Sequence, residues 1–125
     1  MREMIFPAIY KHFKHDENGS LNNYLYAAVG VAKTVSIDEL HKCEEFESVG
    51  TYSETETGDR LNVYVTKENI MVIPVSDSYE MGVEYVVYKS LYDSGTYLRP
   101  YEMFTGEVDK VKYPKVKQKY RFEAI

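Results

Sequence analysis

The 125-residue sequence contains no tryptophan, a single cysteine at position 43 and no low-complexity tract. One cysteine excludes a disulfide scaffold. No apolar run approaches the roughly 18 residues that a membrane-spanning helix requires. The first residues lack both the apolar core and the cleavage site of a secretory signal. An unpaired thiol also suits a reducing compartment, so we predict a cytoplasmic protein with no membrane partner.

Tyrosine is abundant: the chain has 13 tyrosines and 5 phenylalanines. Apolar residues make up 44% of the chain and charged residues 28%, which is the composition of a folded globular protein and excludes a disordered one. The length fits one domain, residues 1–125. Tyrosines in such a domain either cap a small core at its rim or form a recognition surface.

Charge is distributed unevenly along the chain. The net charge of -5 argues against a protein that grips nucleic acid through its phosphates. Eight acidic residues and one basic residue lie between Asp38 and Asp59, whereas six basic residues and no acidic one lie between Lys110 and Arg121. The two stretches are either solvated faces or surfaces that meet a partner, which leaves homo-oligomerisation and an anionic ligand open.

Alternating apolar and polar residues predict short strands along most of the chain. A Ser-x-x-Glu capping box at Ser36 and Glu39 predicts one short helix over 37–46. The Asn18-Gly19 pair predicts a hairpin turn. The expected fold is mainly β, a small antiparallel barrel-like domain (SH3-like or similar) with one short inserted α-helix. The predicted strands cover 10–14, 23–33, 51–55, 60–66, 70–75, 83–91 and 96–99, with one or two edge strands within 108–122.

Several short motifs follow one another in a characteristic order: YKHFK at 10–14, Tyr24-x-Tyr26, VVYKSLY at 86–92, YLRPYEMF at 97–104 and YRF at 120–122. The order resembles that of family 1653 of the domains of unknown function, found in bacteria and phages. The resemblance implies a compact β-barrel-like domain without a described activity. Extra length over about 33–72, which carries the predicted helix, is atypical of that family and is interpreted as an insert.

Arg99 is the leading candidate for a ligand-binding residue, because it ends a predicted strand between Tyr97 and Tyr101. A guanidinium flanked by rings stacks on a ring or forks onto a carboxylate or phosphate. In the alternative interpretation Arg99 forms an ion pair with Glu102 or an acid elsewhere, and Tyr97 and Phe104 are core. Strand alternation places Tyr88 and Tyr92 along a shallow groove, with Val87 and Leu91 inward. The full candidate set is His12, Lys14, Tyr26, Tyr88, Tyr97, Arg99, Glu102 and Arg121.

These residues predict a non-enzymatic binding module that recognises a protein segment or a small anionic ligand. A second hypothesis is a small-barrel nucleic-acid binder whose basic strip, 110–121, follows the phosphates. A third is an enzyme built around His12 and a carboxylate such as Glu102. No phosphate-binding loop or catalytic motif supports an enzyme. The pair His12 and His15 offers too few ligands for a metal, so no metal, cofactor or catalytic residue is predicted.

Overall fold

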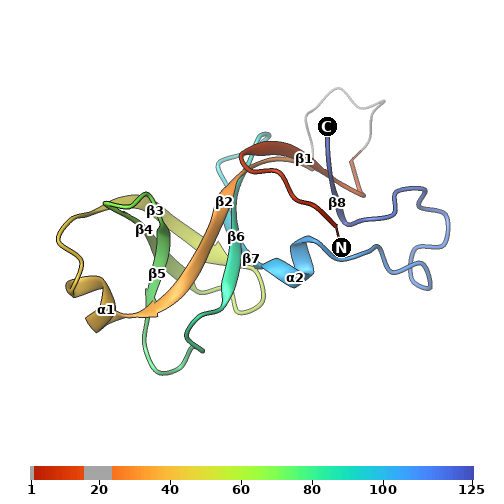
Figure 1. Cartoon of the computed structure of the whole chain (residues 1–125). Helices are drawn as coiled ribbons and strands as arrows, with labels where there is room; N and C mark the ends of the chain where they lie inside the picture. The colour runs from red at the N-terminus through yellow and green to blue at the C-terminus, as the bar shows by residue number, and fades with distance from the viewer. Residues whose placement is uncertain (1, 16–23) are drawn as a thin grey trace.

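The computed structural model describes residues 2–15 and 24–125, so the predicted Asn18-Gly19 turn lies outside the described residues. Eight strands and two short helices follow one another along the chain (Figure 1). Their bounds are β1 Ala8–His12, β2 Leu25–Ser36, α1 Ile37–His41, β3 Phe46–Glu54, β4 Arg60–Thr66, β5 Met71–Val75, β6 Glu84–Ser90, β7 Thr96–Pro100, α2 Tyr101–Phe104 and β8 Phe122–Ala124.

Six of the strands close into a barrel, which confirms the predicted mainly β, barrel-like fold. The strand order is β5-β4-β3-β7-β6-β2, and β2 pairs with β5 to complete the circle. Two of these pairings, β2 with β5 and β3 with β7, are parallel, and the others are antiparallel. The remaining strands, β1 and β8, continue the sheet from β2 outside the closed ring.

The local sequence explains most of the strands, and two predictions need correction. Ser36 caps the helix as predicted, since its hydroxyl accepts the Glu39 amide N–H at 3.1 Å. The helix ends at His41, however, because Phe46 already pairs with Thr66 in the barrel. The predicted edge strands within 108–122 are also wrong. That segment is irregular apart from one bridge between Glu107 and Tyr120, and β8 begins only at Phe122.

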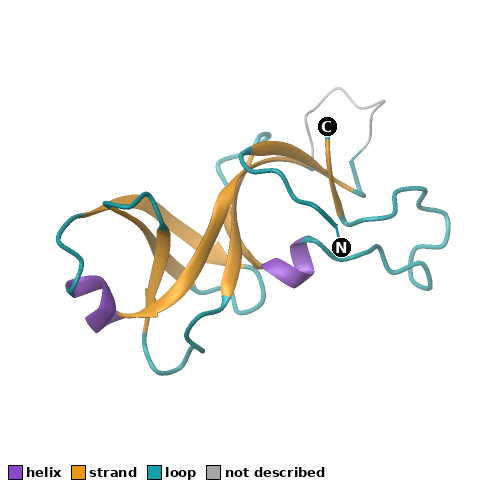
Figure 2. Cartoon of the chain, in the orientation of Figure 1, coloured by secondary structure: helices purple, strands orange, loops and turns teal. Residues whose placement is uncertain are grey.

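The stretch interpreted as an insert is part of the barrel. Residues 33–72 contain α1, β3 and β4, and β3 and β4 are two of the six barrel strands. Figure 2 shows the two helices apart from each other, one beyond the end of β2 and the other directly after β7. Among the described residues, no helix has the length and apolar character needed to cross a bilayer.

Two hydrophobic clusters lie on opposite faces of β6. Tyr85 and Val87 face the barrel interior, whereas Val86 and Tyr88 face outward into a second cluster. The barrel core consists of Ala32, Tyr52, Val63, Ile73, Val75, Tyr85, Val87 and Leu98. The second cluster, which we call the aromatic cluster, consists of Tyr10, Tyr26, Ala28, Val86, Tyr88, Phe104 and Phe122. Because both faces of β6 are buried, the expected open groove along Tyr88 does not exist.

Candidate functional site

Phe122, the first residue of β8, is the hub of the aromatic cluster. Its ring stacks on Phe104 with centroids 4.2 Å apart and lies 5.8 Å from both Tyr26 and Tyr88. The ring is only 1% exposed, so it serves as a floor for the groups around it. Sequence reasoning did not select Phe122 as a site residue, although it belongs to the closing YRF motif and that motif was the available signal.

Arg99 lies on this floor from β7. Its Cζ is 5.4 Å from the Phe122 ring centroid, and its Nε donates to the Tyr88 hydroxyl at 3.0 Å. The alternative ion pair, with Glu102 or another acid, is wrong, because Arg99 makes no ion pair within residues 2–15 and 24–125. Its second part is confirmed for Phe104, which is buried, and Tyr97 packs against the same cluster. The hydrogen bond uses only Nε, so both terminal nitrogens of the guanidinium keep their donors for a ligand.

His12 approaches the same floor from the end of β1. Its ring lies edge-on to Phe122 at 5.0 Å, and its Nδ1 accepts the Lys14 amide N–H at 3.2 Å. Burial, with the positive charges of Arg99, Lys14 and Arg121 adding to it, lowers the pKa of His12 from 6.5 to about 4. At neutral pH the ring is therefore uncharged, and since Nδ1 accepts, the proton is on Nε2.

Three cations, Arg99, Lys14 and Arg121, thus act on one neutral imidazole. None of the three pairs with a carboxylate among the residues that the structure describes. Positive charges without acidic partners attract negatively charged groups. The chemistry that fits the arrangement is binding of an anion through charge-assisted hydrogen bonds.

The predicted tyrosines lie around this cation group, mostly beneath it. Tyr88 is 2% exposed and Tyr26 9%, so neither forms an open surface. The Tyr26 and Tyr92 hydroxyls are 3.0 Å apart, and burial together with this contact raises the pKa of Tyr26. Tyr97 packs on Tyr88 at 5.4 Å. These rings hold Arg99 and Phe122 in place, and the exposed ring is Tyr92, at 40%.

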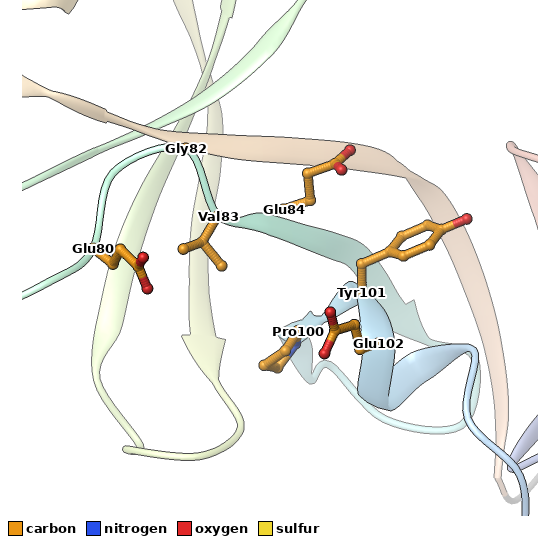
Figure 3. A pocket seen from close by; sticks show the side chains of 7 residues that line it. All are labelled: Glu80, Gly82, Val83, Glu84, Pro100, Tyr101 and Glu102. Carbon is orange, nitrogen blue, oxygen red and sulfur yellow. The ribbon is translucent and has the colours of Figure 1, made fainter.

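Glu102 is the one predicted site residue that belongs elsewhere. It lies on α2 and lines a cavity of about 430 Å³ together with Glu80, Glu84, Val83 and Tyr101 (Figure 3). The charges acting on His12 are all positive, so the structure does not form the His12 and Glu102 pair that an enzyme would use. Three carboxylates make this cavity repel anions, whereas the positive charges lie around Phe122.

Other candidate chemistry is sparse in the described part of the chain. No group of three or more His, Cys, Asp or Glu side chains there is placed to hold a metal ion. Cys43 is half-buried, and its Sγ donates to the Glu39 carbonyl at 3.6 Å. Lys110 of the basic strip bonds to the backbone of its own loop, donating to the carbonyls of Val116 and Gln118. The strip is thus partly structural.

Comparison with known proteins supports the resemblance found in the sequence. Residues 67–124 match the model of the family described as "Protein of unknown function (DUF1653)". The match begins before β5 and includes Tyr88, Tyr97, Arg99 and Arg121, so the cation group is partly inside it; His12 and Lys14 lie outside. The searches of curated proteins and of solved structures found no significant match.

Proposed function

We propose that this chain, through its DUF1653 region and the strand before it, is a non-enzymatic module that binds an anionic group. The observation that carries the proposal is the cation group of Arg99, Lys14 and Arg121 around the neutral ring of His12. In a protein whose net charge is -5, three clustered cations without acidic partners favour a negatively charged ligand. The free cysteine suits a reducing compartment, and we place the module in the cytoplasm.

The donors available at the site define the ligand. Arg99 offers its two terminal nitrogens, His12 offers Nε2–H and Lys14 and Arg121 offer their charged ends. The planar guanidinium groups of the arginines and the ammonium group of Lys14 together suit a ligand group with several oxygens, such as a phosphate or a carboxylate. Half-burial of His12 and Arg99 lowers the local dielectric and strengthens each of these interactions relative to water.

Isothermal titration calorimetry with inorganic pyrophosphate and with citrate tests the proposal. The decisive variant is Arg121→Ala, because the Arg121 side chain makes no hydrogen bond to the described residues and its loss should leave the fold intact. We expect at least a tenfold weaker affinity for the better of the two anions. Lys33→Ala, which removes one exposed positive charge beside the acidic cavity, is the matched control and should bind like the wild type.

Arg99→Ala should also abolish binding, with an additional loss of stability because the buried Tyr88 hydroxyl loses its partner. Circular dichroism at the assay temperature separates the two effects. A wild-type protein that binds neither anion at 50 mM salt would contradict the proposal, and so would an Arg121→Ala variant that binds as tightly as the Lys33→Ala control.

A further inference from the structure

The anion site is one end of a longer feature, a row of aromatic rings that continues across the surface. Successive ring centroids are 4.9 Å apart from Tyr113 to Phe13, 4.3 Å from Phe13 to His12, 5.6 Å from His12 to Tyr24 and 6.0 Å from Tyr24 to Tyr92. Each of the five rings keeps part of its surface accessible, in contrast to the fully buried rings below them. We call this set the ring row.

Positive charges accompany the ring row from Tyr113 to His12. Lys112 Nζ lies 5.5 Å from the Tyr113 ring and Lys14 Nζ lies 5.9 Å from the Phe13 ring. Arg99 and Arg121 act on His12, the central ring. A small anion would occupy only the His12 region and would leave Tyr113, Phe13 and Tyr92 without a role.

The acidic part of the molecule is directed away from this surface. Figure 1 shows α1, which opens the acidic stretch, at the opposite end of the barrel from the blue segment that carries Tyr113. The net charge of -5 is thus a sum over a molecule with differently charged ends. The field next to the ring row is set by its own lysines and arginines together with Asp109 beside Tyr113 and Asp93 beside Tyr92.

A surface with several aromatic rings and several positive charges is typical of proteins that bind one class of polymer. Single-stranded nucleic acids are bound by aromatic side chains on which bases stack and by positive charges that follow the phosphates. A duplex keeps its bases stacked inside the helix and cannot present them to such a row. We propose that the ring row binds a single-stranded nucleic acid, with one phosphate in the cation group at His12; the inference rests on the proposed function for that one contact.

Fluorescence anisotropy with a labelled 12-nucleotide oligo(dT) tests the inference, with a 12-base-pair duplex as the competing probe. We expect the single strand to bind more tightly than the duplex at 50 mM salt. Three or four phosphate contacts should make the affinity fall roughly 20- to 50-fold between 50 and 200 mM salt, from a slope of about -0.7 per contact for single strands. Equal affinity for duplex and single strand would overturn the proposal.

The variant Tyr113→Leu separates this inference from the anion site, because it removes a ring that contacts the Phe13 ring and not the His12 ring, while keeping apolar bulk. Oligonucleotide affinity should fall by at least about fivefold, whereas pyrophosphate affinity should stay unchanged. Phe46→Leu is the matched control: its ring is also partly exposed and also contacts one other ring, that of Tyr64, at the far end of the barrel. It should change neither affinity.

The outcomes are distinguishable. Pyrophosphate binding without oligonucleotide binding would overturn the ring row and leave the anion site. If the wild-type protein binds neither pyrophosphate nor the oligonucleotide, both proposals are overturned. Oligonucleotide binding that survives Tyr113→Leu and a second variant, Phe13→Leu, would show that the rings do not contact bases, which also overturns the inference.

Discussion

The barrel core and the aromatic cluster share β6 as a common wall, yet their chemistry differs. Six of the eight residues in the barrel core are aliphatic, and the hydroxyl of Tyr52 has no hydrogen-bond partner within the described part of the chain. In the aromatic cluster five of seven residues are aromatic, and the Tyr88 hydroxyl is bound by Arg99. One strand thus serves stability on its inner face and holds a polar site on its outer face.

The difference between the aliphatic barrel core and the aromatic cluster indicates which of the two packed regions can also hold a binding site. Aliphatic side chains fill a closed barrel without leaving polar groups to satisfy. Large rings with polar tips bury equal area but also present hydroxyls and ring faces that hold a guanidinium, as Tyr88 and Phe122 do for Arg99. Substitutions in the two regions should therefore separate stability from binding.

The largest effect is expected from Phe104→Ala, which removes the ring stacked on Phe122. Phe104 is fully buried, so truncation should cost about 3–5 kcal/mol of unfolding free energy. It should also weaken anion binding, because Phe122 loses its support. Urea unfolding measures the first effect and calorimetry the second. Phe46→Ala removes an exposed ring and should cost far less; equal losses would mean that the aromatic cluster is not a core.

Glu54→Ala should damage the barrel and spare the site. The Glu54 carboxylate is 2% exposed and accepts the backbone N–H groups of Glu56 and Thr57 at 2.9 and 3.0 Å. Each hydrogen bond to a charged group contributes about 1.5–3 kcal/mol, so losing both should cost at least about 3 kcal/mol. Glu56→Ala, an exposed neighbour, is the control and should be nearly neutral. A fall in anion affinity for Glu54→Ala would contradict the expectation that substitutions in the barrel leave binding at the aromatic cluster unchanged.

Acid should act mainly on the aromatic cluster, through His12. Its pKa is about 4 in the folded protein and about 6.5 when unfolded, so between these values the unfolded state binds more protons. Stability should therefore rise with pH from 4 to 6.5. After allowance for solvent around the half-buried ring, we expect roughly 1–2 kcal/mol. Unfolding titrations of wild type and His12→Gln across this range check it; a variant with the same pH slope would exclude His12 as the cause.

An anion bound at the site should raise the pKa of His12 toward its ordinary value, since negative charge favours the imidazolium. Binding should then be tighter at pH 5 than at pH 7 and should take up a proton. Calorimetry in two buffers of different ionisation enthalpy measures that uptake. An affinity that is constant over this range would place the anion away from His12.

The smallest effects compare two hydroxyls. Tyr52→Phe removes the unpartnered hydroxyl from the barrel core and should raise the unfolding free energy by up to about 1 kcal/mol. Tyr88→Phe removes a partnered one and should lower it by about 1 kcal/mol, with weaker anion binding because Arg99 loses its anchor. Thermal unfolding of the two variants side by side gives the comparison, and changes of the same sign would contradict it.

The sequence predicted strand bounds accurately where alternating apolar and polar residues were compatible with a strand alone. The predicted strand 60–66 is β4, and 83–91 differs from β6 by one residue at each end. Alternation alone did not reveal that both faces of β6 are covered, because nothing local indicates what packs on each face; Tyr88 was therefore expected in a groove. The parallel pairing of β2 with β5, which closes the barrel, is likewise a long-range contact without a local signal.

For the site, the sequence indicated which residue types to select, but it did not indicate where their side chains point. His12, Lys14, Arg99 and Arg121 were predicted; His12 and Arg99 both lie against the Phe122 ring, and the charges of Arg99, Lys14 and Arg121 lower the pKa of His12. Glu102 was placed with them because it is close to Arg99 in the sequence, but the turn of α2 directs it into the acidic cavity. Phe122 was overlooked because a buried ring near the end of a chain looks like ordinary core until its neighbours are known.

The pairing of β1 with β8 has a consequence for how the protein is made. All six barrel strands are complete once Pro100 has been synthesised, and the barrel can close at that stage. The anion site needs His12 from the first strand and Phe122 from the last, with Arg2 donating to the Phe122 carbonyl across the same junction. A chain truncated after Pro100 would therefore keep all six barrel strands but lack Phe122, and under the proposed function we expect it not to bind an anion.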